Sequence, residues 1–340
     1  MLNNSPYLLK PASVRSVMLR VLAALIPGVV AYVWFFGAAV LVQLTIASLA
    51  ALAGEAVMLS LRNKPPRTIW MFVSDGSALV TAWLIALTFS PIVPWWLMVV
   101  AVLFAIVVVK HLFGGLGQNP FNPAMAAFCL MIVAYPQLMS QWPAVGFTDF
   151  AAQWQVIFGE RSLDALVTAT PLDYLRTQLH TADARATVAG VLGSGASFGN
   201  IGGKGWEWVA AGYLAGGLWL VQQRIITWHI PAAFLAMMAA ASGLAHLVSP
   251  EQFAGAVFHT FTGGAMLGAF FIATDPVSGA TTPRGKLIYA AGIALLTWII
   301  RSFGAYPDGI AFATLLMNIC VPLIDMKTQP PVFGRKKGQP

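Results

Sequence analysis

Long apolar stretches with almost no charge recur along this chain and constrain its fold more than any other feature. A helix of about 18 or more apolar residues can cross the roughly 30 Å hydrocarbon core of a bilayer. Apolar residues make up 58% of the 340 residues and charged residues 9%, too little polar surface for a soluble globule. We therefore expect an all-α polytopic membrane protein with about ten transmembrane helices. The predicted spans are residues 18–36, 38–61, 76–91, 95–113, 124–142, 206–222, 229–248, 254–274, 287–302 and 308–325.

The basic residues lie in short clusters beside these spans, as expected when they set membrane topology. With the N-terminus inside, fourteen of the 19 Lys and Arg residues face the cytoplasm, and most of the others lie in one long loop. This predicts a bacterial inner-membrane protein with both termini in the cytoplasm. It argues against nucleic acid as the partner that explains the net charge of +7. The first span has no following cleavage site of small residues, so we expect it to be retained.

The only two cysteines, Cys129 and Cys320, both fall within apolar stretches. Their number and position leave neither a disulfide framework nor a Cys cluster for zinc or iron–sulfur ligation. We expect both to be buried thiols.

Residues 143–205 contain much of the polar sequence, including five of the 12 acidic residues, and are predicted to form a periplasmic insertion. Connections of this length tend to be functional or disordered. The chain would then divide into a first membrane half, 1–142, the insertion, a second membrane half, 206–326, and a basic cytoplasmic tail, 327–340.

An internal similarity relates the two membrane halves. Residues 76–82 resemble residues 263–269, and the polar segment 117–123 has a counterpart in 304–309. The copies lie five spans apart, and an odd number of spans inverts the second copy. We therefore expect two inverted five-helix repeats with a site between them. The alternative is that small residues simply populate helix-packing faces.

Thr170 is followed by Pro171 and, three residues on, by Asp173. This order is typical of a helix N-cap with proline at the first helical position. A phosphate ester on such a threonine would lie at the positive end of the helix dipole, so capping and modification are compatible.

Several motifs together resemble the D subunit of the Rnf ion-translocating oxidoreductase complex, related to the B subunit of the sodium-translocating NADH:quinone reductase. The resemblance covers essentially the whole chain. The motifs are Gly-Gly-Leu-Gly-Gln-Asn-Pro-Phe-Asn-Pro-Ala at 114–124, Ala-Thr-Pro-Leu-Asp at 169–173, Leu-Gly-Ala-Phe-Phe-Ile-Ala-Thr-Asp-Pro at 267–276, Ile-Arg-Ser-Phe-Gly-Ala-Tyr-Pro-Asp-Gly at 300–309 and Pro-Leu-Ile-Asp at 322–325.

The resemblance implies FMN joined through its phosphate to a threonine hydroxyl by a separate flavin transferase outside the cytoplasm. The family's attachment pattern fits residues 275–281, ending at Thr281, at every position. Residues 164–170, ending at Thr170, depart from it at Val167 and Thr168. Topology favours Thr170, because Thr281 is predicted to face the cytoplasm. In the family the modified threonine precedes Pro-Leu in the long loop, as Thr170 does.

Asn119 and Asn122 interrupt the apolar sequence before the fifth span. Each amide offers a donor and an acceptor that suit the polar edge of a flavin or a water at membrane depth. The resemblance implies a second, noncovalent flavin, riboflavin, near them. The alternative is that both residues cap the fifth span. Asn-Pro-Ala also imitates a water-channel signature, but the sequence has one copy and such a channel needs two.

Glu55 lies deep in the second span, where a charge costs at least about 2.5–3.5 kcal/mol on insertion scales. It requires a partner or a water path, and it is a candidate for carrying a coupling ion. The alternative is an ordinary packing or interfacial role. The same alternative applies to the other ionisable residues in or beside spans, namely Asp75, Lys110, His111, His246, His259 and Asp308.

The leading hypothesis is a redox subunit that passes electrons between the covalent FMN and riboflavin, coupled to Na⁺ or H⁺ translocation. The resemblance implies the A, B, C, E and G subunits of the Rnf complex as partners. NADH and ferredoxin would bind those partners, since this chain has neither a dinucleotide-binding Gly motif after a strand nor a Cys cluster. Two alternatives are a secondary transporter or solute channel, which also uses inverted repeats, and a scaffold that holds redox partners together.

Overall fold

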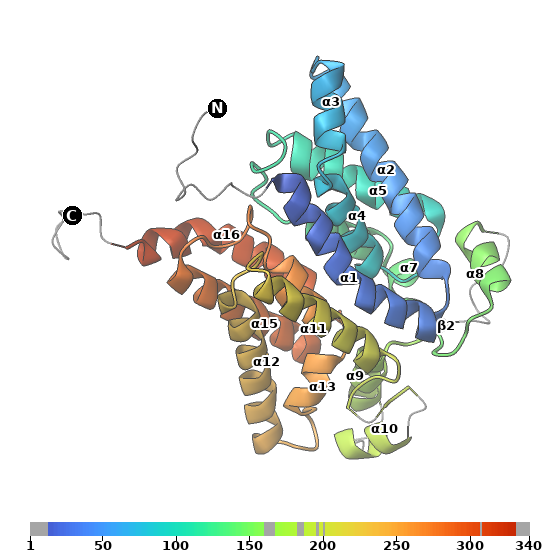
Figure 1. Cartoon of the computed structure of the whole chain (residues 1–340). Coiled ribbons are helices and arrows are strands. Elements are labelled where there is room, and N and C mark those ends of the chain that lie inside the picture. Colours follow the sequence, from blue (N-terminus) through green and yellow to red (C-terminus); the bar gives the residue numbers. More distant parts are fainter. Residues whose placement is uncertain are drawn as a thin grey trace.

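The computed structural model describes residues 13–159, 167–181, 187–194, 197–199, 201–306 and 308–330, and these ranges are mostly helical (Figure 1). Within them, six helices are long and apolar enough to cross a membrane, and two shorter apolar helices accompany them. The six are Val14–Phe36, Ala39–Leu61, Pro66–Thr88, His229–Val248, Pro283–Phe303 and Ile310–Thr328; the shorter two are Trp95–His111 and Pro123–Ala134. The chain is a multi-pass membrane protein, as its sequence predicts.

Capping residues mark both ends of the first helix and the start of the last helix in the N-terminal group. Ser13 caps the first helix by accepting a hydrogen bond from the Ser16 N–H, and Gly37, with φ 87°, ends it. Asn122 caps the last through the Met125 N–H. The elements are α1 (Val14–Phe36), α2 (Ala39–Leu61), α3 (Pro66–Val73), α4 (Ser77–Thr88), α5 (Trp95–Leu103), the π-helical η1 (Phe104–His111) and α6 (Pro123–Ala134).

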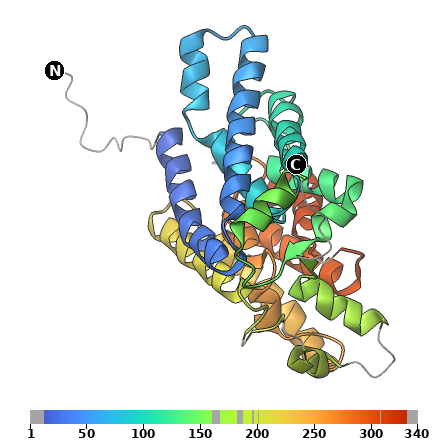
Figure 2. The same cartoon turned by 90° about the vertical axis from the view of Figure 1, so that its right-hand side faces the viewer.

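The C-terminal group contains α11 (Trp206–Gln222), α12 (His229–Val248), α13 (Ala256–Phe261), α14 (Ala265–Leu267), η3 (Gly268–Ile272), α15 (Pro283–Phe303) and α16 (Ile310–Thr328). The predicted boundaries at 206–222 and 229–248 are confirmed. In Figures 1 and 2, α2 and α3 form a hairpin that extends away from this second group.

Glycine turns break the chain at two places among the membrane helices. Between α3 and α4 the chain turns at Gly76, with φ 84°, and between α13 and α14 it turns at Gly263, with φ 67°. Glycine adopts these left-handed conformations without the steric penalty of a Cβ. The continuous span predicted at 254–274 is therefore a broken helix, and α3 precedes the predicted 76–91 span as an additional half-helix.

Helices α1 and α11 lie side by side where the two groups meet (Figure 1). Glycine makes the contact possible, because a Cβ on Gly216 would collide with the Ala24 carbonyl and one on Gly212 would meet the Gly28 backbone. Small residues allow helix backbones to approach closely in membranes.

The long connection between the groups is folded within its described residues. Its elements are α7 (Pro136–Ser140), β1 (Trp142–Pro143), α8 (Phe150–Ile157), β2 (Val167–Thr168), α9 (Pro171–Thr181) and α10 (Val188–Ser194). Strands β1 and β2 pair antiparallel, with Trp142 opposite Thr168. The predicted fifth span ends early, since Tyr135 leaves helical geometry just before Pro136, as residues before proline tend to do.

Two parts of this connection are anchored to the membrane helices. The buried Gln153 amide accepts a hydrogen bond from the Ala39 N–H at 3.1 Å and donates one to the Phe36 carbonyl at 2.8 Å, which fixes α8 at the turn between α1 and α2. A small apolar core joins α9 and α10 to α13 and the residues before it. Its buried members are Leu172, Leu175, Val188, Val191, Ala254 and Phe258.

Candidate functional site

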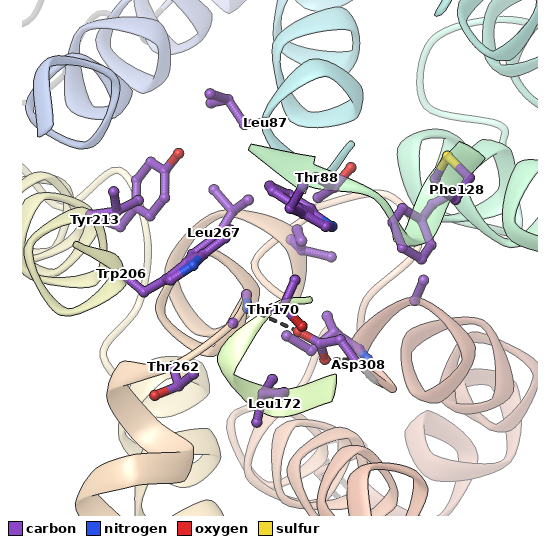
Figure 3. A pocket seen from close by; sticks show the side chains of 18 of the residues that line it. Leu87, Thr88, Phe128, Thr170, Leu172, Trp206, Tyr213, Thr262, Leu267 and Asp308 are labelled. Atoms are coloured by element: carbon purple, nitrogen blue, oxygen red, sulfur yellow. Dashed lines mark hydrogen bonds between the residues drawn. The ribbon is translucent and has the colours of Figure 1, made fainter. Parts of the chain in front are cut away.

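A cavity of about 920 Å³, including its open mouth, lies where α9 meets the membrane helices. Figure 3 places Thr170 near its centre, with Trp206 and Tyr213 on one side and Phe128 on the other. Its walls come from the C-terminal end of α4, the N-terminal ends of α11 and α16, and the turn before α14. Most of the lining side chains are apolar, with a few polar groups among them, as is common for ligand pockets.

Thr170 is the N-cap of α9, as its sequence predicts. Its Oγ1 accepts a hydrogen bond from the Asp173 N–H at 3.2 Å, and its carbonyl accepts one from the Tyr174 N–H at 2.8 Å. The side chain is half-buried and lines the cavity. The Thr170 hydroxyl therefore lies between the positive end of a helix dipole and an open cavity. Asp164, the first residue of the candidate attachment pattern, lies outside the described residues.

An ion pair closes the cavity beneath Thr170. Arg301, whose side chain is fully buried, donates from Nη2 to Asp308 Oδ2 at 3.1 Å and from Nη1 to the His259 carbonyl at 2.7 Å. Asp308 Oδ2 also accepts from the Gly264 N–H at 2.9 Å. Asp308 thus holds the start of α14 against α16, and its charge is neutralised. The sequence placed Asp308 near a span end but gave no sign of its pairing with Arg301.

Two indoles contribute to the cavity wall. Trp142 on β1 and Trp206 at the start of α11 pack edge to face, with ring centroids 4.9 Å apart. Edge-to-face packing is a favoured aromatic geometry. Sequence reasoning missed both, because they come from segments 64 residues apart that meet only through the pairing of β1 with β2 and the seam between α1 and α11.

Asn119 and Asn122 line a second cavity, of about 940 Å³ including its mouth. It opens at the other end of α4, since Ser77 lines it while Thr88 lines the first cavity. Asn122 caps α6, as the alternative interpretation predicted, whereas the Asn119 amide instead donates to the Phe121 carbonyl at 2.9 Å. Asn122 therefore both caps α6 and lines the second cavity.

A buried polar network supports the second cavity. The Asn318 side chain accepts from the Asn122 N–H at 3.1 Å and donates to the Ser278 carbonyl at 2.9 Å and the Tyr289 hydroxyl at 2.8 Å. Asp275, which lines the cavity, accepts from the Ser278 hydroxyl at 2.7 Å. Burial nevertheless raises the pKa of the Asp275 carboxyl above its ordinary value. Sequence reasoning did not single out Asn318.

Glu55 has the partner that its position requires. Its Oε2 lies 2.7 Å from Lys110 Nζ and 3.3 Å from His111 Nε2, and Lys110 also donates to the Ser77 hydroxyl at 3.0 Å. Lys110 and His111 are both buried within the protein. They are the last two residues of the π-helical η1, which packs against α2.

Thr281 lies far from the first cavity. It precedes α15, whereas Arg301 and Asp308 lie at or beyond the helix's other end, and a helix of 21 residues is about 30 Å long. The Thr281 hydroxyl donates to Asp325 at 2.7 Å. The two candidate threonines are therefore at opposite ends of the membrane helices.

The remaining sequence candidates carry no metal site within the described ranges, where no three His, Cys, Asp or Glu side chains cluster suitably. His246 bonds to the Phe253 carbonyl at 2.7 Å, and Asp75 Oδ1 accepts from the Ser77 N–H at 2.7 Å. Cys129 is buried, as expected. Cys320 is exposed, which corrects that expectation, because it lies on a face of α16 that the described residues leave uncovered.

Comparison with known proteins identifies the family. A model described as the NQR2, RnfD, RnfE family matches residues 1–334. The chain belongs to this family. Among curated members, proteins named as the D subunit of an ion-translocating oxidoreductase complex are 45% identical in Aeromonas salmonicida and 44% in Escherichia fergusonii, each alignment covering 98% of both chains. The family resemblance inferred from the sequence motifs is thus confirmed.

Proposed function

We propose that this chain is the membrane-embedded, flavin-carrying D subunit of an ion-translocating oxidoreductase complex of the Rnf type. The observation that carries the proposal is the hydroxyl of Thr170, which caps α9 and lines an open cavity with mostly apolar walls. The relatives are named as the D subunit of such a complex, which supports the same assignment.

The first cavity fits a flavin nucleotide esterified to Thr170. The indoles of Trp142 and Trp206 offer flat apolar surface for an aromatic ring system. A phosphodiester on Oγ1 would retain one negative charge, and the N-terminal end of α9 favours negative charge. Asp308 does not oppose it, because Arg301 neutralises that carboxylate.

Attachment requires an external enzyme. A threonine hydroxyl is a weak nucleophile without a base, and within the described part of the chain the Thr170 hydroxyl is bonded only to the Asp173 N–H. We therefore propose that a flavin transferase on the extracytoplasmic side forms the phosphorus–oxygen bond. The donor would be a flavin dinucleotide, whose diphosphate bond would break so that the nucleoside monophosphate leaves, and the hydroxyl proton would pass to a base on that transferase.

Once bound, the flavin would supply the redox chemistry, accepting and releasing electrons. This chain's residues would position it: Thr170 would tether the phosphate, the indoles would pack on the ring, and the Arg301–Asp308 pair would hold the floor of the cavity. The apolar walls would exclude water from the ring.

The second cavity is the proposed place of a noncovalent riboflavin. Asn119 and Asn122 line it, and Asn318 holds the Asn122 backbone in place. The two cavities share α4, whose 12 residues are about 18 Å long. Electrons would thus pass between flavins at opposite ends of this short helix, in a complex with the A, B, C, E and G subunits that draws on NADH and ferredoxin.

We also propose that Glu55 takes part in moving the coupling ion, Na⁺ or H⁺. Its carboxylate is bound to Lys110, so an arriving cation would have to compete with that ammonium group. Ionisable residues inside membranes are costly and commonly mark ion pathways.

The proposed architecture is a pair of inverted five-helix repeats. The order α1, α2, α3–α4, α5–η1, α6 has a parallel in α11, α12, α13–η3, α15, α16. In each series the third helix is broken at a glycine, and a buried cation from the end of the fourth, Lys110 or Arg301, bonds to that broken helix. The termini would lie in the cytoplasm of the inner membrane and the 143–205 connection in the periplasm.

The broken helices also favour a second candidate, a secondary transporter, since discontinuous helices commonly form transporter binding sites. A direct experiment separates the two. The chain is produced together with the flavin transferase, denatured, precipitated in acid and run on a gel. We expect a fluorescent band for the wild type that persists in Thr168→Ala and Thr281→Ala and is lost in Thr170→Ala. An unlabelled wild-type band would favour the transporter.

A further inference from the structure

Two tyrosine hydroxyls in the first cavity's wall have no hydrogen-bond partner among the described residues. Tyr32 on α1 is 1% exposed and Tyr213 on α11 is 4% exposed, and both line the cavity. A buried phenol usually has a hydrogen-bond partner. Burial removes the water that its hydroxyl would otherwise bind, and an unpaired hydroxyl leaves that loss uncompensated. Two unpaired phenols in one wall indicate that a polar group of a bound molecule forms hydrogen bonds with them.

The other hydroxyls that line this cavity are already bonded. Thr88 donates to the Leu84 and Ile85 carbonyls at 2.9 Å, Thr262 accepts from the Gly203 N–H at 3.2 Å, and Thr170 accepts from the Asp173 N–H. Among the described residues, the two phenols therefore differ from these threonines in having no hydrogen-bond partner at all.

Packing fixes both rings before any molecule binds. A Cβ on Gly28 would overlap the Tyr213 ring, so α1 presses directly on that side chain. The Tyr213 ring also lies 6.0 Å from the Phe271 ring, and the Tyr32 ring lies 5.1 Å from Phe36 and 6.0 Å from Trp206. Neither hydroxyl can turn far to seek another partner, which is the arrangement expected of a preorganised site.

We propose that Tyr32 and Tyr213 donate hydrogen bonds to the carbonyl oxygens at the polar edge of the flavin tethered to Thr170. The inference rests on the proposed function and deepens it. Electron density at those atoms rises when the ring is reduced, and hydrogen bonds to more negative acceptors are stronger. The two hydroxyls are thus positioning residues that favour the reduced flavin over the oxidised one.

The test is an anaerobic redox titration of the purified full chain, produced with the flavin transferase and followed by visible absorption. The same titration of Thr170→Ala gives the signal of any flavin held elsewhere, which is subtracted. Tyr32→Phe and Tyr213→Phe each remove one oxygen and keep the ring. The matched control is Tyr135→Phe, at a tyrosine that lines neither of the two cavities.

We expect the midpoint potential of the Thr170-linked flavin to become more negative in both variants and to stay at the wild-type value in Tyr135→Phe. Infrared spectra provide a second readout, in which the flavin carbonyl stretch shifts to higher frequency when a donor is lost. The inference is overturned if both tyrosine variants give the midpoint potential and carbonyl bands of the wild type while their gel bands stay fluorescent. The proposed function would then remain intact. A wild-type gel band without flavin would overturn the proposed function itself.

Discussion

At the scale of single residues, two acidic side chains in or beside the predicted spans are each neutralised by a buried cation. Glu55 on α2 pairs with Lys110 on η1, and Asp308, just before α16, pairs with Arg301 on α15. A lone ion in hydrocarbon is expensive, whereas a hydrogen-bonded pair is tolerated. The sequence predicted that Glu55 needs a partner. It did not identify Lys110, because a π-helical turn decides which side chain of η1 faces α2.

The Glu55–Lys110 pair gives a prediction for stability. Glu55→Gln leaves the buried Lys110 ammonium without its counter-charge, and breaking a buried pair in this way costs about 3–5 kcal/mol. We expect a lower thermal unfolding midpoint for the detergent-purified protein. The double variant Glu55→Met/Lys110→Met removes both charges and should recover most of the loss. A single variant as stable as the wild type would contradict the described pairing.

Asn318 gives a second residue-scale prediction. Asn318→Leu removes an acceptor for the Asn122 N–H and a donor to Ser278 and Tyr289, so the wall of the second cavity should loosen. We expect loss of the noncovalent flavin, measured in the supernatant after acid precipitation, while covalent flavin in the gel band is unchanged. The control is Gln137→Leu, at an exposed position of α7. Equal noncovalent flavin in all three proteins would show that Asn318 does not support that site.

At the scale of elements, hydrophobic patterning predicted where helices run but not where they break. The ends of α11 and α12 match the sequence prediction, because polar or glycine residues flank a continuous apolar run. The break at Gly76 coincides with the start of the predicted 76–91 span, although the half-helix α3 before it was not predicted. The break at Gly263 falls inside the predicted 254–274 span and was missed. The site follows the same rule: Thr170 was found through its local capping signal, whereas Trp142, Trp206 and the tyrosine pair depend on tertiary contacts.

The α1–α11 seam gives the element-scale prediction. Alanine normally stabilises a helix relative to glycine by about 1 kcal/mol, but a Cβ on Gly216 would collide with the Ala24 carbonyl. Overpacking of this kind costs about 1–3 kcal/mol, so Gly216→Ala should lower the unfolding midpoint. Gly243→Ala on α12 is the matched control, since its Cβ would meet Ala256 at an ordinary 3.8 Å. Equal midpoints for the two variants would refute the close seam.

At the scale of the whole molecule, the first cavity and the basic loops occupy opposite ends of the helices. Arg62 and Lys64 follow α2, and Arg284 and Lys286 begin α15, whereas Thr170 meets the distal end of α15 through Asp308. The sequence predicted this polarity from the distribution of charge. The docking of α9 onto the membrane helices could not be predicted from the sequence, because Leu172 and Leu175 form their anchoring contacts with α10 and α13.

Orientation is tested by labelling single cysteines in a background that carries Cys129→Ala and Cys320→Ala. Thr168→Cys and Lys64→Cys both lie at exposed positions, near Thr170 and in the turn after α2. In spheroplasts, we expect a membrane-impermeant maleimide to label Thr168→Cys and to reach Lys64→Cys only after lysis. The reverse pattern would invert the proposed topology.

The central claim, that Thr170 carries the flavin, is tested most directly by mass spectrometry of the native assembly. Trypsin releases residues 162–176, which contain both Thr168 and Thr170, separately from the fragment containing Thr281. The account predicts that the 162–176 fragment is heavier by one FMN less one water, with fragment ions that place the addition on Thr170. An unmodified 162–176 fragment, or the same addition on the fragment with Thr281, would contradict it.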